Sequence, residues 1–193
     1  MKFTRTAGVA VGLALTVAAA FPGVASAETV TSEVSGGSLS LTSQPVTFAS
    51  TALNGANQTI TATPATAWSL SDARGTGAAW TATVSATAPT SAAGTVETTA
   101  RSIAVGNLSV SAGTATAVTG SDPNTNITGA SSLALSTSAQ TLISSSGTNK
   151  GTYTFSPSIG LLIPANAFRS NYSAAVGSTS LNAYTSTLTL SIS

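Results

Sequence analysis

The C-terminal segment of the chain alternates apolar and hydroxylated residues with a period of two. Between Tyr184 and Ile192, Leu188, Leu190 and Ile192 share one face of an extended chain, while threonines and Ser191 share the other. Successive side chains of a β-strand point to opposite faces, so this period is typical of a strand that packs one face on a core. The segment therefore predicts a strand whose hydroxylated face meets water or a partner.

Similar alternation recurs along the chain and predicts further strands at residues 30–34, 39–41, 46–48, 80–86, 103–105, 108–112, 133–135 and 153–155. Gly, Pro and Asn separate these segments, and Gly106-Asn107 has the form of a two-residue hairpin turn. No apolar stripe of helical period follows residue 27. We expect an all-β fold, an antiparallel β-sandwich of the immunoglobulin-like, Greek-key type, rather than a barrel.

The N-terminus has the three parts of a secretory signal peptide. Lys2 and Arg5 supply positive charge, residues 7–20 are apolar, and Ala25-Ser26-Ala27 offers small residues for cleavage before Glu28. A membrane anchor is the alternative, but the apolar run is shorter than the ~20 residues that a spanning helix needs. We expect residues 1–27 to be a cleaved signal-peptide helix and residues 28–193 to be a single secreted domain.

Charge and composition exclude several classes of protein. Without Lys2 and Arg5 the basic residues are Arg74, Arg101, Lys150 and Arg169, which are far apart in the sequence, so nucleic acid is not an expected partner. The chain has no Cys, so disulfides cannot stabilise it. Disorder is disfavoured, because hydrophobic residues make up 42% of the chain and its net charge is close to zero.

Catalytic chemistry has few candidate residues. The chain has no His and no Cys, which excludes the Ser-His-Asp and Cys-His systems and the usual zinc sites. A carboxylate enzyme acting on polysaccharide would depend on Asp72, Glu97 and Asp122, whose spacing suggests no catalytic pair. Lys150, the base that a Ser-Lys hydrolase would need, lies in a polar turn. We expect no enzymatic activity and no cofactor.

One segment has the spacing with which calcium-binding loops begin. Asp122, Asn124 and Asn126 place three oxygen ligands at alternate positions. A complete loop would require Gly in place of Ile127 and Glu in place of Leu133, and Asx turns also explain the segment. Calcium is therefore the weaker of the two interpretations.

Three segments resemble a family of bacterial surface proteins. Residues 68–84 contain Asp72-Ala73-Arg74-Gly75-Thr76-Gly77 before a strand that begins at Trp80, and residues 163–168 and 184–192 provide a closing pattern that begins Tyr-x-x-x-Leu-Thr. These features resemble the WxL-domain proteins of Gram-positive cell surfaces, in which an Asp-x-Arg-Gly-Thr-Gly turn leads to a Trp-bearing strand. The chain departs from the pattern where Leu190 and Ile192 replace the closing Trp and Leu, and where no Leu follows the Trp80-Thr81 pair.

The resemblance implies a secreted protein that attaches non-covalently to the cell wall, where the domain binds peptidoglycan. It makes Trp68, Trp80, Asp72, Arg74 and Tyr184 the candidate ligand-binding residues. For each Trp the alternative is a core anchor, and the solvent exposure of the two rings distinguishes these roles. For Asp72 and Arg74 the alternative is a local ion pair or an Asx turn.

Three hypotheses about function follow from the sequence. The first is a secreted, non-catalytic protein of the cell surface that binds wall glycan and has no membrane anchor after cleavage. The second is a structural subunit that pairs through its C-terminal strand with itself or with other surface proteins. The third is the carboxylate enzyme, which would need Asp72, Glu97 and Asp122 to lie close together.

Overall fold

The computed structural model describes residues 29–193. Ser35–Ser193 form one compact unit, and residues 29–34 belong to a separate one. The expected signal peptide, residues 1–27, lies outside the described residues. Residues 30–34 form no strand, and Val30 and Val34 are each 94% exposed, so the strand predicted there is wrong.

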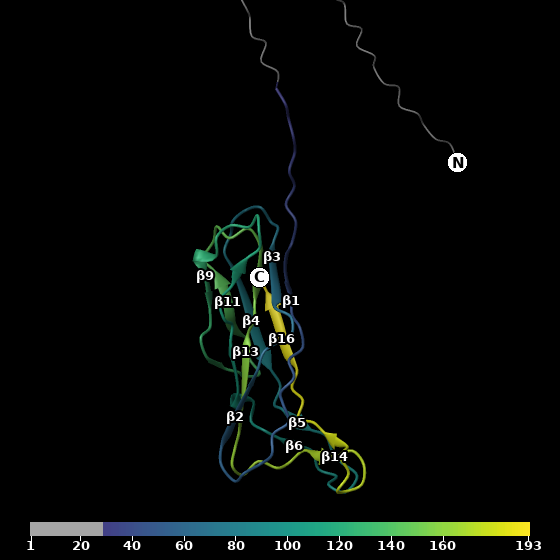
Figure 1. The fold of residues 1–193 in the computed structure, drawn as a ribbon. Coiled ribbons are helices and arrows are strands. Elements are labelled where there is room, and N and C mark those ends of the chain that lie inside the picture. The colour runs from purple at the N-terminus through teal and green to yellow at the C-terminus, as the bar shows by residue number, and fades with distance from the viewer. Residues whose placement is uncertain (1–28) are drawn as a thin grey trace, which may run out of the picture. The chain divides into compact units, whose positions relative to one another are not determined.

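Within the described residues, three four-stranded antiparallel sheets share one hydrophobic core (Figure 1). The first has the order β1 (Leu39–Thr42), β3 (Trp68–Asp72), β12 (Gly151–Phe155) and β8 (Thr116–Ala117). The second has the order β10 (Leu133–Ala134), β7 (Leu108–Ser111), β13 (Ser158–Ile163) and β2 (Gln58–Ala62). The third has the order β16 (Leu188–Ile192), β4 (Trp80–Ala86), β11 (Gln140–Ser145) and β9 (Ile127–Gly129).

Alternate residues of these strands point inward. In β4 every second residue is buried, from Trp80 to Ala86, and β3 buries Trp68, Leu70 and Asp72 in the same way. Full burial of one large apolar side chain contributes about 1.5–3 kcal/mol, so the shared inner faces account for the packing without a disulfide. The predicted all-β, antiparallel, sandwich-like class is confirmed.

No two neighbouring strands of the three four-stranded sheets are consecutive in the sequence, so crossover connections rather than hairpins join them. β4 pairs with β16 through Val84 and Leu190, and with β11 through Trp80 and Ser145. The β16 strand confirms the C-terminal prediction, although pairing begins at Leu188. Its inward residues are only half-buried, because β16 lies at the edge of its sheet.

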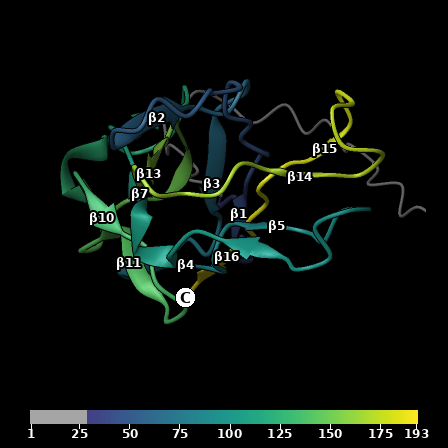
Figure 2. The same ribbon diagram turned by 90° about the horizontal axis from the view of Figure 1, so that it is seen from below.

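Four short strands form two two-stranded sheets at one end of the compact unit (Figures 1 and 2). We call this part of the unit the lower lobe. Its strands pair β5 (Thr90–Ser91) with β6 (Arg101–Ser102) and β14 (Asn171–Tyr172) with β15 (Leu181–Asn182). Buried Asn171 joins the two pairs, since its backbone N–H donates to the Ser91 hydroxyl at 2.8 Å and its side chain donates to the carbonyl of Ala92 at 2.8 Å.

Three local predictions are wrong. Gly106-Asn107 belongs to a 3-10 turn, η1 (Val105–Asn107), and not to a hairpin. β6 before it and β7 after it lie in different sheets, so no hairpin joins them. Residues 46–48 and 103–105 are not strands either, although the first of these segments still packs its apolar side chains on the core.

The described residues contain only two short 3-10 turns, η1 and η2 (Asn124–Asn126), besides strands and loops. In this part of the chain no helix has the length and apolar character that crossing a bilayer requires.

Candidate functional site

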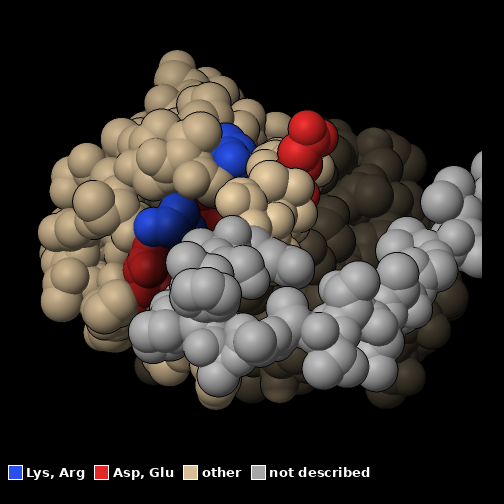
Figure 3. Space-filling model, turned by 90° about the horizontal axis from the view of Figure 1, so that it is seen from above, with Lys and Arg blue, Asp and Glu red and all other residues tan. Residues whose placement is uncertain are grey.

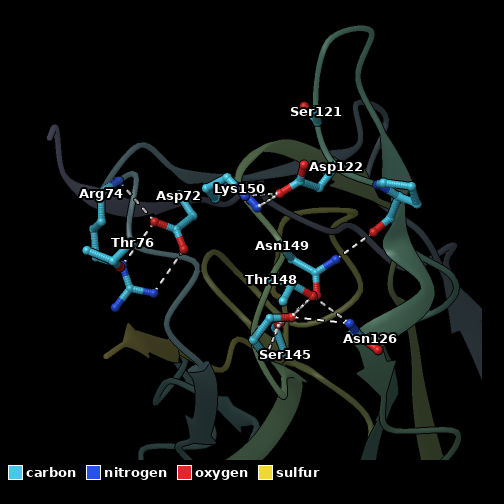
Figure 4. Close-up of polar contacts among 12 residues, drawn as sticks. Asp72, Arg74, Thr76, Ser121, Asp122, Asn126, Ser145, Thr148, Asn149 and Lys150 are labelled. Carbon is cyan, nitrogen blue, oxygen red and sulfur yellow. Dashed lines mark hydrogen bonds and ion pairs between the residues drawn. The ribbon is translucent and has the colours of Figure 1, made fainter. Parts of the chain in front are cut away.

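Asp72 and Arg74 form a closed pair at the end of β3 (Figure 4). Arg74 Nε donates to Asp72 Oδ1 and Arg74 Nη2 donates to Asp72 Oδ2, each at 2.9 Å, and the Arg74 backbone N–H donates to Oδ1 at 3.1 Å. This guanidinium holds the pKa of the Asp72 carboxyl below its ordinary value. Arg74 Nη2 also donates to the carbonyl of Ala78, so the pair stabilises the turn in which it lies. This arrangement fits the interpretation of the two residues as a local ion pair.

The same turn is joined to the loop between β11 and β12. Gly75 and Gly77 have φ angles of 74° and 66°, a region that residues with a Cβ rarely occupy, so the Gly-Thr-Gly sequence fits the turn. The Thr148 backbone N–H donates to the Gly77 carbonyl at 2.7 Å. The Asp-x-Arg-Gly-Thr-Gly motif therefore forms a turn that is hydrogen-bonded to the loop between β11 and β12. We call this contact the joint between the two loops.

The side chains of the possible calcium ligands contact separate protein partners. Asp122 forms an ion pair with Lys150 at 2.7 Å, which lowers the pKa of its carboxyl. The Asn124 side-chain amide donates to the Ala115 carbonyl, and that of Asn126 donates to Thr148 Oγ1 at 2.7 Å. The three side chains serve separate contacts within turns, and among the described residues no group of three His, Cys, Asp or Glu side chains has the arrangement of a metal site.

The carboxylates that an enzyme would need are likewise paired. Asp72 and Asp122 lie on either side of Lys150 at the upper end of the unit (Figure 4). On the upper face, basic and acidic side chains adjoin and most of the remaining surface carries no charge (Figure 3). Glu97 precedes β6 in the lower lobe, at the other end, and forms an ion pair with Arg169 at 2.7 Å.

Both tryptophans belong to the core. Trp68 is 1% exposed and Trp80 is 2% exposed, so neither ring is available as a platform for a sugar. Trp68 packs edge-on against Phe155 at 5.9 Å between ring centroids, and its Nε1 donates to the Gln44 carbonyl at 3.0 Å. Trp80 Nε1 is buried without a hydrogen-bond partner among the described residues. The core-anchor interpretation is the one that fits both residues.

A groove of about 550 Å³ opens beside Trp68, and we call it the β16 groove. One wall is the segment after β1 and the other is the chain leading into β16, and buried residues of β7 and β13 lie at its base. Its lining includes Ser43, Gln44, Pro45, Val46, Thr47, Phe48, Trp68, Pro89, Leu108, Ile159, Leu161, Ala183, Tyr184, Thr185, Ser186, Leu188 and Leu190. The groove combines an apolar base with aromatic and hydroxylated walls.

Tyr184 is the predicted site residue that lies in the wall of this groove. The ring is half-buried, and its hydroxyl donates to the Phe168 carbonyl at 3.0 Å, which fixes the ring's orientation. Burial raises the pKa of the Tyr184 phenol, so the hydroxyl stays protonated at neutral pH. Across the groove, the Gln44 carbonyl accepts a hydrogen bond from Trp68 Nε1. The buried Trp68 therefore positions the facing wall.

The sequence did not identify residues 43–48 as part of a site. The sequence feature that pointed to this segment was the alternation of Val46 and Phe48, and both side chains do pack against the core. Comparison of the chain with protein-family models, with curated proteins and with solved structures found no match.

Proposed function

We propose that the protein is an exported, non-catalytic protein of the cell surface that binds cell-wall glycan non-covalently through the β16 groove. The observation that carries the proposal is the lining of the groove, which includes the aromatic residues Phe48 and Tyr184 together with the hydroxylated residues Thr47, Thr185 and Ser186. A sugar ring has an apolar face that packs on an aromatic ring and hydroxyls that exchange hydrogen bonds with such side chains.

Three further observations support the proposal. The first 27 residues have the composition of a signal peptide. The chain has neither His nor Cys, and Asp72, Glu97 and Asp122 each have a cationic partner, so none is poised as a free general base. The resemblance of residues 68–84 to WxL-domain proteins favours the cell wall as the location, with binding assigned here to the groove instead of to the two tryptophans.

Loss of the Tyr184 ring is expected to weaken wall binding about tenfold, which corresponds to roughly 1.4 kcal/mol. The measurement is co-sedimentation of the 28–193 chain with purified cell walls over a range of protein concentrations. Tyr184→Ala removes the groove wall, whereas Tyr184→Phe keeps the ring and removes only a hydroxyl that binds within the protein. The phenylalanine variant is therefore expected to bind like the wild type.

Thr189→Ala is the matched control, because Thr189 lies on the outer face of β16 and is exposed. It is expected to leave sedimentation unchanged. If the wild-type chain stayed in the supernatant at low and moderate salt, the proposed wall binding would be wrong. Equal sedimentation of Tyr184→Ala and wild type would instead move the binding site away from the groove.

A second candidate function is assembly into a surface structure through strand edges. β1 and β16 are edge strands that lie side by side in both views without pairing with each other (Figures 1 and 2). Ser193 exchanges both backbone hydrogen bonds with Thr81, at 2.8 and 3.1 Å. Bonding partners alternate along an antiparallel strand, so Leu188 and Leu190 turn their backbone groups away from β4, toward the edge beside β1. Another strand can pair with that edge if it enters between β16 and β1.

Edge assembly predicts that the mean mass measured by light scattering rises with protein concentration. Leu190→Lys places a charge at the free edge and is expected to keep the protein monomeric, because inward-pointing charges block edge pairing. Thr189→Lys adds the same charge on the outer face of β16 and serves as the control. A wild-type chain that remains monomeric up to about millimolar concentration would contradict this candidate.

A further inference from the structure

The lower lobe contains a cluster of basic and aromatic side chains, which we call the Arg101 cluster. The Arg101 guanidinium lies 3.9 Å from the centroid of the Phe168 ring, and the Arg169 guanidinium lies 4.4 Å from that of Tyr172. Glu97 accepts a hydrogen bond from Arg169 at 2.7 Å and stands 3.7 Å from Arg101. Two arginines thus share one carboxylate, which leaves the cluster with a surplus of positive charge.

The donors of Arg101 are not used within the part of the chain that the structure describes. Its Nε is buried and has no hydrogen-bond partner there, and its contact with Glu97 is too long for a hydrogen bond. Arg74 is the opposite case, since it donates to both oxygens of Asp72 and to the Ala78 carbonyl. A guanidinium that lies over a ring and has unused donors is suited to a planar or tetrahedral oxyanion.

The Arg101 cluster adjoins the β16 groove. The Tyr184 hydroxyl donates to the backbone carbonyl of Phe168, the residue whose ring lies against Arg101. The charge of Arg101 also acts on the pKa of the Tyr184 phenol, opposing the upward effect of burial. The wall of the β16 groove is therefore bonded directly to the residue whose ring contacts Arg101.

The Arg101 cluster differs from the upper end of the unit in its balance of positive and negative charge. At the upper end of the unit, Arg74 is matched by Asp72 and Lys150 by Asp122. In the lower lobe, Glu97 matches only one of Arg101 and Arg169. Among the described residues, positive charge thus exceeds negative charge in the lobe and not at the upper end.

From these contacts we propose that Arg101, supported by Arg169, binds an anionic group, a phosphate or a carboxylate, that the glycan polymer carries. The proposal rests on the proposed function, because it names the class of polymer that the β16 groove receives. The apolar and hydroxylated part of the ligand lies along Tyr184, and its oxyanion accepts hydrogen bonds from the guanidinium of Arg101.

The direct test is a titration of the 28–193 chain, which contains the whole compact unit, with inorganic phosphate and separately with acetate. This chain has only three arginines, so each Nε–H signal in an NMR spectrum is assignable by substitution. The Arg101 signal is expected to shift saturably, while that of Arg74 stays in place. Equal, non-saturating shifts of both signals with both anions would overturn the proposal.

The second test uses purified walls, with and without prior removal of phosphate polymers by hydrofluoric acid. Arg101→Ala is expected to weaken sedimentation about tenfold or more, because hydrogen bonds to a charged group are the strong ones. Arg101→Lys keeps the charge but loses the planar fork, and an intermediate loss is expected. Glu97→Gln removes the competing carboxylate and is expected to strengthen binding.

Lys150→Ala removes one positive charge at the far end of the unit and is the matched control, with no expected change. Wall binding that is lost after acid extraction identifies a phosphate as the anion, and binding that survives extraction but is weakened by Arg101→Ala identifies a carboxylate. If wild type sediments and Arg101→Ala sediments equally, the anion proposal fails and the proposed function stands. If wild type does not sediment, the proposed function fails, and the phosphate and acetate titrations alone decide whether Arg101 binds anions.

Discussion

Trp68→Ala is expected to lower the free energy of unfolding by about 3–5 kcal/mol, the usual cost of removing a large aromatic side chain from a core. Trp68 is 1% exposed and packs edge-on against Phe155, so its loss opens a cavity among β3, β12 and the groove base. Its Nε1 also holds the Gln44 carbonyl, so the wall of the β16 groove is expected to loosen together with the core. Urea unfolding followed by far-UV circular dichroism measures the loss.

A comparison of conservative variants separates packing from this hydrogen bond. Trp68→Phe loses the bond to Gln44, whereas Trp80→Phe loses none and removes a buried N–H that has no partner among the described residues. We expect Trp68→Phe to be the more destabilising of the two by about 1 kcal/mol, the net contribution of one hydrogen bond. An equal or smaller cost for Trp68→Phe would contradict the structural role assigned to its Nε1.

The fold class could be predicted because the strand signal is local. Alternation in residues 80–86 and 184–192 follows from which side chains reach the core, and it is visible in either segment by itself. The same signal fails at residues 30–34, where alternation occurs in a segment outside the compact unit. The hairpin predicted at Gly106-Asn107 was wrong for a related reason, since the residues that favour a hairpin turn also suit a 3-10 turn.

The β16 groove could not be predicted, because its walls and base come from parts of the chain that only the fold brings together. Gln44 meets Trp68 across 24 residues of sequence, and Tyr184 comes from the other end of the unit. Sequence reasoning reached Tyr184 through the resemblance to WxL-domain proteins. It also named both tryptophans as candidate ligand residues, with a core anchor as the competing interpretation, and the structure buries each of them.

The Arg101 cluster had no sequence signal either. Glu97 and Arg169 are 72 residues apart, and neither arginine lies in a basic run. Long-range ion pairs and cation–π contacts have no period and no motif, so they become visible only in three dimensions. Asp72 and Arg74 differ from this cluster. They are two residues apart in the sequence, so a local ion pair between them could be proposed from the sequence alone.

Asp72→Ala is expected to destabilise the protein by about 1.5–3 kcal/mol, the usual contribution of hydrogen bonds to a charged group. The Asp72 side chain is fully buried, while that of Arg74 keeps 26% of its exposure and can partly turn to water, which favours the lower end of the range. Asp122→Ala is the control, because its pair with Lys150 is exposed on both sides and contributes much less. A loss for Asp72→Ala as small as that for Asp122→Ala would contradict the role assigned to the buried pair.

The dependence on pH follows from the direction of the pKa shift. Arg74 depresses the pKa of Asp72 in the folded protein, so the stabilisation is complete above the carboxyl's unfolded value of about 3.9. It is lost as the pH falls below that value and through the depressed folded pKa. Asp72→Asn resembles the protonated acid in shape, so the gap in unfolding free energy between wild type and this variant is expected to be largest near neutral pH and to close progressively below about pH 4. Urea unfolding between pH 2 and 7 measures this gap, and a gap that stays constant as the pH falls would show that the charge of Asp72 does not stabilise the joint between the two loops.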